Sequence, residues 1–243
     1  TDDYSYNNMA AGTALKDGKA TEKTYQEEYK LVGYFGRINY NYQGKYYLSA
    51  SIRHEGSSKF GADHKWGTFP AVSIGWNLKE ESFLKNVNFL SFLKLRAGYG
   101  ITGTIPGNPY LSLNTLDLGG YGYYGGQWTT LLRASSNPNP DLRWEKKKET
   151  NIGLDFAFFN DRISGSIDWY NRDTDDLIWD YTVSVPPYVK NTITANAGSI
   201  RNRGLEVSLN FIPVKTKSFT WNTGINFSTN SNELVSLSNG KYS

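Results

Sequence analysis

The sequence predicts an all-β fold, an antiparallel up-and-down transmembrane β-barrel segment of about eight strands. Apolar and polar residues alternate with a period of two through most of the chain, which places one set of side chains on each face of a strand. Brief turns also alternate with long connections, as in barrels with short turns at one end and large loops at the other. Aromatic residues make up 15% of the sequence, a share that suits a membrane–water boundary or a sugar-binding surface.

The clearest strand prediction comes from two alternating runs between residues 151 and 169. Only Asn160 and Asp161 separate these runs, and a two-residue polar turn between alternating segments predicts a β-hairpin. One face of the hairpin is apolar, whereas the other carries mainly Asn, Gly, Asp and Ser. The apolar face consists of Ile152, Leu154, Phe156, Phe158, Ile163, Ile167 and Trp169.

The same alternation predicts six further strands. They cover residues 31–42, 46–53, 70–78, 93–101, 205–211 and 219–228. Brief turns are expected at 43–45, 160–161 and 213–218, one helical turn within 79–91, and long connections at 54–68, 102–145 and 174–203. The strand that leaves Arg162 is also expected to continue, past a break at 173–176, through Leu177, Trp179, Tyr181 and Val183.

The polar face of these strands favours a barrel over a soluble sandwich. The exposed face of a sandwich usually carries Lys, Glu and Thr, whereas this face is mostly Gly, Ser and Asn with scattered Arg and Asp. Small polar residues suit a lumen filled by water or by a plug. Tyr and Trp also gather near strand ends, where an interfacial girdle is expected. These residues are Tyr40, Tyr42, Tyr46, Tyr47, Trp169, Tyr170 and Trp221.

The composition excludes several classes of protein and site. The chain has no cysteine, so disulfides, zinc–thiolate sites and cysteine nucleophiles are ruled out. A formal net charge of +3 is too small to indicate a nucleic-acid partner. No window approaches 18 consecutive apolar residues. The start at Thr1 shows no signal peptide, and we expect a processed or partial chain.

Four groups of polar residues suggest a metal site or catalysis, but none has the spacing or partners that such a site needs. The histidine spacing is not diagnostic, the aspartate run lacks the glycine and distal Glu of a calcium loop, and the remaining groups lack an acid–base partner. We therefore expect no cofactor, no metal and no enzymatic activity. The groups are His54 and His64 beside Glu55 and Asp63, the run Asp173, Asp175 and Asp176, the pair Glu145 and Glu149, and Ser57 with Ser58.

The best candidate for ligand binding is the glycine-rich aromatic segment at residues 119–128. Aromatic rings spaced by glycine stack on sugar rings or peptide groups, while neighbouring polar groups fix the orientation of the ligand. The alternative is a flexible external loop whose rings pack on their neighbours. The candidate residues are Tyr121, Tyr123, Tyr124 and Trp128.

Three stretches of the chain resemble SusC/RagA-type TonB-dependent transporters, and together with the matching strand order the resemblance covers nearly the whole chain. The first lies between Ser51 and Lys85 and contains Arg53, Gly56-Ser57-Ser58, Phe60-Gly61, Trp66-Gly67, Phe69-Pro70, Gly75-Trp76 and Glu81-Ser82-Phe83-Leu84. The second is Asn139-Pro140-Asp141-Leu142-Arg143-Trp144-Glu145. The third contains Asn196, Gly198, Asn202, Gly204, Leu205 and Glu206.

The resemblance implies a partial β-barrel domain over residues 1–243, from the C-terminal half of a barrel of about 22 strands. The plug domain, the TonB-contacting segment and the final strands are expected to lie outside this chain. The implied location is the outer membrane of a Gram-negative bacterium, with outer-membrane lipid around the barrel. The implied function is the import of oligosaccharides or oligopeptides, with a SusD-like surface lipoprotein and TonB as partners.

Two other interpretations remain open at this point. A complete small outer-membrane barrel with an adhesin or structural role requires closure between residues 31–42 and 219–229, although the connection at 102–145 is long for so small a body. A secreted carbohydrate-binding β-sandwich requires Ile152, Leu154 and Phe156 to be buried inside the protein.

Overall fold

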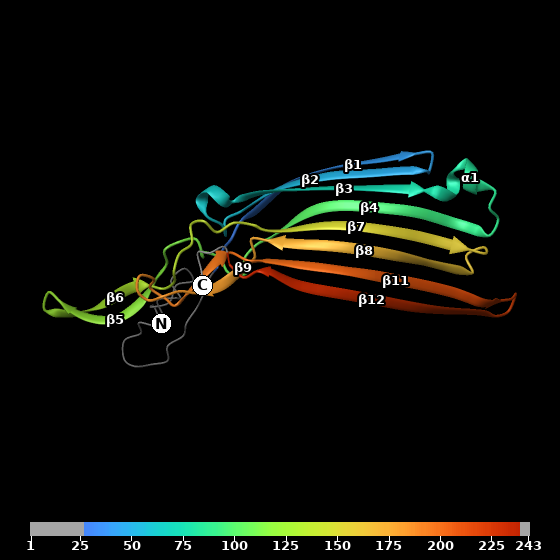
Figure 1. The fold of residues 1–243 in the computed structure, drawn as a ribbon. Helices are drawn as coiled ribbons and strands as arrows, with labels where there is room; N and C mark the ends of the chain where they lie inside the picture. Colours follow the sequence, from blue (N-terminus) through green and yellow to red (C-terminus); the bar gives the residue numbers. More distant parts are fainter. Residues whose placement is uncertain (1–26, 239–243) are drawn as a thin grey trace.

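The computed structural model describes residues 27–238 as one large antiparallel sheet with two small hairpins beyond one of its ends (Figure 1). The eight predicted strands are confirmed, and neighbours in the sheet follow chain order once the two hairpins are left out. The sheet contains β1 (Leu31–Tyr42), β2 (Tyr46–Ser57), β3 (Trp66–Asn77), β4 (Leu90–Thr104), β7 (Glu145–Phe158), β8 (Ile163–Asp175), β11 (Ser199–Lys215) and β12 (Thr220–Ser236). In the described part of the chain β1 and β12 are edge strands and do not pair with each other, so the closure that a complete small barrel requires is not formed.

The connections differ between the two ends of the sheet, which we call the turn end and the loop end. At the turn end the connections are brief, and the longest of them holds the 3-10 turn η3 (Leu78–Glu80) and the expected helical turn α1 (Ser82–Lys85). The loop end holds two hairpins, β5 (Leu116–Tyr124) with β6 (Gln127–Ala134), and β9 (Ile178–Thr182) with β10 (Thr192–Asn196). Among residues 27–238, no helix is long and apolar enough to cross a membrane.

Two expectations about the loop end are corrected. The first connection is shorter than predicted, because β2 continues to Ser57 and β3 begins at Trp66, with only the 3-10 turn η2 (Ala62–His64) between them. Strand β8 does not continue past the break. It ends at Asp175, and Ile178 begins a separate hairpin with β10.

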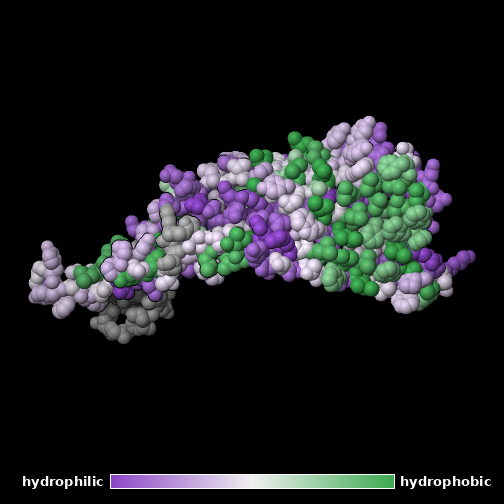
Figure 2. All heavy atoms as spheres, viewed as in Figure 1, coloured by the Kyte–Doolittle hydropathy of each residue, from purple (hydrophilic) through white to green (hydrophobic). Residues whose placement is uncertain are grey.

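The register separates the sheet into an apolar and a polar face. One row of cross-strand neighbours contains Tyr40, Leu48, Ile74, Ala97, Ile152, Trp169 and Leu205. The adjacent row, which points to the opposite face, contains Asn39, Ser49, Ser73, Gly98, Asn151, Tyr170 and Gly204. Figure 2 shows hydrophobic residues gathered over the turn-end part of the sheet and hydrophilic residues toward the loop end.

The apolar face is uncovered rather than buried. Ile38 is 73% exposed, Ile225 is 58% exposed and Ile152 is 47% exposed. The β-sandwich interpretation requires Ile152, Leu154 and Phe156 to be buried inside the protein, and it is wrong because Ile152 is exposed and the other two are only partly buried. Apolar side chains in such numbers are stable on a surface only where the surrounding medium is itself apolar, which is the condition that a lipid bilayer supplies.

The interfacial girdle is confirmed in part. Tyr40, Tyr42, Tyr46 and Trp221 lie near the turn end on the apolar face, as expected. Tyr47 and Tyr170 instead alternate onto the polar face. Tyr47 is the cross-strand neighbour of Gly75, and Tyr170 that of Asn151 and Gly204.

Glu81 fixes part of the girdle at the turn end. Its carboxylate accepts hydrogen bonds from the Tyr46 hydroxyl at 2.6 Å, from Trp76 Nε1 at 3.0 Å and from Lys45 Nζ at 3.3 Å. These bonds favour the charged form, and the one from Tyr46 contributes most to lowering the pKa of Glu81 from its ordinary value of 4.5. Tyr46 and Trp76 therefore place their polar atoms against one carboxylate at the turn end of the apolar face.

A small buried core lies at the loop end, next to the place where the sheet divides. Strands β3 and β4 pair only from Asn77 opposite Lys94 to Ala71 opposite Gly100. The Trp144 ring packs against the Phe60 ring at 4.8 Å and the Phe69 ring at 5.1 Å, and Leu142 completes the core. Trp144 Nε1 also donates to the Lys65 carbonyl at 3.0 Å, which satisfies the one polar atom of the indole.

The first test concerns the assignment of the two faces. Val72 is the middle of the five apolar-face positions from Trp76 to Thr68 on β3, and Ser73 is its polar-face neighbour. In the full-length protein in lipid vesicles, we expect Val72→Lys to lower the free energy of unfolding by about 2–4 kcal/mol, because it places an ammonium group in lipid. The matched variant Ser73→Lys should cost much less. Equal losses in denaturant unfolding would contradict the assignment.

The second test concerns the core at the loop end. Trp144→Ala removes a side chain that is 3% exposed, and such a truncation costs about 3–5 kcal/mol. We expect faster hydrogen–deuterium exchange in residues 58–69 and 139–146, with unchanged exchange in the turn-end halves of the strands. Trp179→Ala, which removes a ring that is 65% exposed, is the control. Similar exchange in both variants would show that the core does not hold these segments.

The third test concerns the pH dependence of the Glu81 contacts. Because the folded protein lowers this pKa, the contacts contribute stability that is fully present above the unfolded pKa and is lost as the pH falls through the folded pKa. We expect the wild-type protein to melt at a lower temperature once the pH is below about 4.5. Glu81→Gln should melt lower at neutral pH and show a weaker acid dependence, while Glu80→Gln should keep the wild-type profile. An unchanged acid profile in Glu81→Gln would refute the assignment.

Candidate functional site

The polar face carries an ion network that joins three neighbouring strands. Arg96 on β4 donates from Nε and Nη2 to both carboxylate oxygens of Asp155 on β7, at 2.7 and 2.8 Å. Its Nη2 also donates to Asp168 Oδ1 on β8, at 2.9 Å. A two-point contact between a guanidinium and a carboxylate fixes direction as well as distance. The network therefore holds the side chains of this part of the wall in one arrangement.

Gly153 makes the network possible. It lies on β7 between Arg96 and Asp168 in the cross-strand register. A Cβ atom at this position would be 2.4 Å from Asp168 Oδ1 and 2.7 Å from Arg96 Nη2. Only a residue without a side chain lets the guanidinium cross β7.

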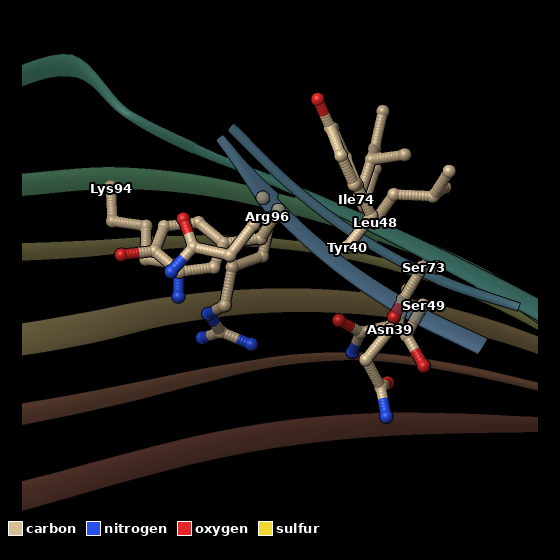
Figure 3. A pocket seen from close by; sticks show the side chains of 14 residues that line it. Asn39, Tyr40, Leu48, Ser49, Ser73, Ile74, Lys94 and Arg96 are labelled. Atoms are coloured by element: carbon tan, nitrogen blue, oxygen red, sulfur yellow. The ribbon is translucent and has the colours of Figure 1, made fainter. Parts of the chain in front are cut away.

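A hollow of about 490 Å³ adjoins this network on strands β1 to β4 and β7. Figure 3 shows Arg96 on the same side of the strands as Asn39, Ser49 and Ser73, with Tyr40, Leu48 and Ile74 on the opposite side. The polar side of the hollow thus offers amide, hydroxyl and cationic groups. Such groups suit a polar solute or a polar segment of protein better than lipid.

Lys94 supplies the second positive charge of this hollow. Its ammonium lies 4.4 Å from the centre of the Tyr47 ring, a cation–π contact. Tyr47 lies on the polar face because its position alternates with those of Tyr46 and Leu48, and there its ring contacts Lys94. The Lys94 ammonium thus contacts a ring, and among residues 27–238 no carboxylate neutralises it.

The four aromatic candidates lie on the hairpin β5–β6, which extends away from the sheet (Figure 1). The segment forms a two-stranded ribbon. Gly125 and Gly126 form its turn with φ values of +61° and +84°, a conformation that glycine adopts without strain. A bulge at Gly119, between the Leu118–Leu132 and Gly120–Leu131 pairs, keeps Leu118, Leu132 and Tyr121 on one face.

The hairpin divides the candidates into two groups. Tyr123 lies opposite Trp128, and the two rings meet edge to face at 5.5 Å. Tyr121 shares their face by alternation, whereas Tyr124 points to the other face. All four side chains are between 65% and 83% exposed. The hairpin therefore presents three rings, with Leu118 and Leu132 beside them, as one open platform.

The polar groups that first suggested metal binding have structural partners. His54 stacks on Trp66 at 4.8 Å, and its Nδ1 lies 2.9 Å from the Thr68 hydroxyl. In the described part of the chain, no three metal-ligating side chains gather. The aspartates at 173–176 form ion pairs, Asp173 with Arg201, Asp175 with Lys148 and Asp176 with Arg143.

The three stretches that carry the family resemblance meet at the base of the loops. The Gly61 amide donates to the Leu142 carbonyl at 3.0 Å, and a Cβ on Gly61 would lie 1.6 Å from the Pro140 carbonyl oxygen. Asn196 Nδ2 donates to the Arg143 carbonyl at 2.7 Å, and Asn196 Oδ1 accepts from the Arg143 amide at 2.8 Å. These contacts therefore fix the position at which the loops leave the wall.

Sequence reasoning singled out the aromatic residues of the hairpin, whose role in binding stays a prediction, and it missed the ion network. Arg96, Asp155 and Asp168 appear in the sequence only as scattered charges on the polar face, separated by up to 72 residues. Their alternation placed them on that face. Which charges meet depends on the register, and no single strand contains that information.

Comparison with known proteins agrees with this geometry. Residues 1–242 match the family model described as TonB dependent receptor-like, beta-barrel. The chain is 43% identical over 231 residues to the TonB-dependent receptor SusC of Bacteroides thetaiotaomicron, covering 92% of this chain and 23% of that protein. It is 39% identical over 218 residues to the TonB-dependent receptor P39 of Formosa agariphila, covering 89% and 20% respectively.

Comparison with solved structures also finds proteins of this kind. The RagAB peptide importer in its open-open state aligns with a TM-score of 0.80 at 28% identity, over 93% of this chain and 24% of that one. The siderophore receptor PirA of Acinetobacter baumannii aligns with a TM-score of 0.54 at 17% identity over 84% of this chain and 28% of that one, which shows the shared fold alone. The chain thus spans about a quarter or less of the length of these relatives. It belongs to the TonB-dependent receptor family and forms part of an outer-membrane β-barrel.

Proposed function

We propose that the whole protein is a TonB-dependent importer that carries oligosaccharides or oligopeptides across the outer membrane, and that residues 1–243 belong to its barrel domain. The single observation that carries this proposal is the two-faced sheet, apolar toward lipid and lined by Arg96, Lys94 and small polar residues on the other side. Such a wall lowers the barrier for a polar solute by surrounding it with a hydrated passage. The relatives support the class of function, since one is a TonB-dependent receptor and another a peptide importer.

The hairpin β5–β6 is the part of this chain that we assign to ligand binding. Aromatic rings bind sugar rings and peptide groups by stacking, and the pairing of β5 with β6 already orders the backbone that carries them. Tyr121, Tyr123 and Trp128 form the contact face. Tyr124, on the opposite face, has a secondary role at most.

The partners follow from the same proposal. A SusD-like surface lipoprotein closes the loop end over the captured ligand. TonB supplies energy through a segment outside this chain, and outer-membrane lipid surrounds the apolar face. We propose neither a catalytic step nor a nucleic-acid partner.

The test uses the full-length transporter with its lipoprotein partner. We expect Tyr123→Ala and Trp128→Ala to weaken binding of the transported oligosaccharide or oligopeptide about 10-fold or more each, since a stacked ring contributes about 0.5–1.5 kcal/mol beyond its area burial. Tyr124→Ala is the matched control and should change affinity less than 3-fold. Calorimetry against a panel of both ligand classes measures the affinity and identifies the class.

The outcomes separate the assignment of the hairpin from the function as a whole. If all three variants bind like wild type, the hairpin is not the ligand site. If uptake by cells that carry the wild-type protein persists after the proton gradient is collapsed, the import is not TonB-dependent and the proposed function itself is wrong.

A further inference from the structure

A trough runs along the apolar face above strands β3 and β4, and neither import nor ligand capture accounts for it. Two hollows form it. One of about 590 Å³ lies among Tyr46, Trp76, Leu95, Ile74 and Ala97. The other, of about 290 Å³, shares Ile74 and Ala97 and continues to Val72, Tyr99 and Ile152. The two hollows therefore lie side by side.

The small side chain of Ala97 creates the floor of the trough. In its row of cross-strand neighbours Ala97 lies between Ile74 and Ile152, and along β4 its neighbours on the same face are Leu95 and Tyr99. Each of these four side chains is larger and at least 39% exposed. A methyl group surrounded by long side chains leaves a groove.

The trough opens toward the medium that surrounds the barrel, not toward the lumen. Figure 3 shows Ile74, Leu48 and Tyr40 on the side of the strands opposite to Arg96 and Asn39. The trough is thus continuous with the lipid-facing surface. It is a local recess in that surface, lined by side chains that form the apolar band.

The position of the trough along the strands selects one leaflet. It begins at Tyr46 and Trp76, beside the turn end, and reaches Val72 four residues farther along β3. Four residues of strand span about 14 Å. One leaflet contributes about 15 Å, half of a hydrocarbon core of about 30 Å. Short turns of outer-membrane barrels face the periplasm, so the trough lies in the periplasmic leaflet.

The mouth of the trough has groups suited to a lipid headgroup. Tyr40, Tyr46 and Trp76 are amphipathic aromatic residues that place their polar atoms at headgroup level. The Lys45 ammonium lies beside them, 3.3 Å from Glu81. An acyl chain in the trough would continue into a polar headgroup at this mouth.

We propose that the trough binds one acyl chain of a glycerophospholipid from the periplasmic leaflet, as a resident lipid rather than an exchanging one. A chain in the trough is flanked by larger side chains of β3, β4 and β7 and lies on the Ala97 methyl group. It therefore gains more dispersion contacts than a chain against a flat part of the barrel. The site needs no specific headgroup, because the Tyr46 hydroxyl and Trp76 Nε1 at its mouth already donate to Glu81.

The experiment counts phospholipids that remain bound to the full-length transporter after extraction in mild detergent, by native mass spectrometry. Ala97→Phe fills the trough, and Ala97→Leu fills it with a smaller side chain in case the first variant does not fold. Ala50→Phe is the matched control, because Ala50 lies on the same face of β2 but lines neither hollow. Heat-modifiable gel mobility confirms that each variant is folded.

We expect wild type and Ala50→Phe to retain one glycerophospholipid per barrel, and the Ala97 variants to retain at least 5-fold less. Equal retention in all variants, or no retained lipid in wild type, overturns the proposal. Retention of a phosphorylated glycolipid instead, which belongs to the outer leaflet, also overturns it. So does a change in oligomeric state in the Ala97 variants without loss of lipid, because the trough would then be a contact between copies of the protein.

Discussion

Lipid cannot hydrogen-bond to a protein backbone, and this constraint governs the sheet described above. Every amide and carbonyl group inside the membrane must find its partner on a neighbouring strand. The antiparallel ladders of 7 to 15 residue pairs between neighbouring strands meet that requirement. Once the ladders are fixed, alternation assigns the side chains to the two faces, because each row of side chains faces either lipid or lumen. The apolar rows, the polar rows and the girdle are all consequences of backbone pairing in a medium without water.

The same constraint explains why the sequence predicted the wall so well. A strand such as β7 must alternate at Ile152, Gly153, Leu154 and Asp155 because its two sides meet different media. Periodicity was therefore sufficient to place all eight strands of the sheet. It was not sufficient to place Tyr47 and Tyr170. An aromatic residue near a strand end suggests a girdle, whereas its face depends on whether its position is odd or even relative to the apolar set.

Beyond the membrane the constraint relaxes, and the sequence becomes harder to interpret. Residues 116–134 form a hairpin whose apolar residues change register at Gly119–Gly120, so a simple period of two misses it. Asp173, Asp175 and Asp176 resemble a metal site in the sequence. In the structure their carboxylates pair with cations on β7, β11 and the segment before β7. These contacts join residues 27 to 33 positions apart, and only tertiary structure brings them together.

The buried core around Trp144 connects the wall to the loops. It uses water-excluding packing of Phe60, Phe69 and Leu142, the ordinary means by which a soluble domain is stabilised. Different interactions thus stabilise the two parts. Backbone pairing, which lipid enforces, stabilises the wall, and the hydrophobic core stabilises the base of the loops. The loops are therefore anchored at a point whose packing does not depend on the membrane.

The two edges of the sheet show what the rest of the protein must provide. Every described residue of β1 is exposed, as is nearly all of β12, and in each strand one row of backbone groups has no partner within residues 27–238. Unpaired rows of this length are unstable in lipid and are ready templates for further strands. The relatives, of which this chain covers less than a quarter, are long enough to supply those strands. The curvature of the wall, the polarity of its inner face and the lipid-facing trough therefore belong to a closed barrel of which this sheet is one part.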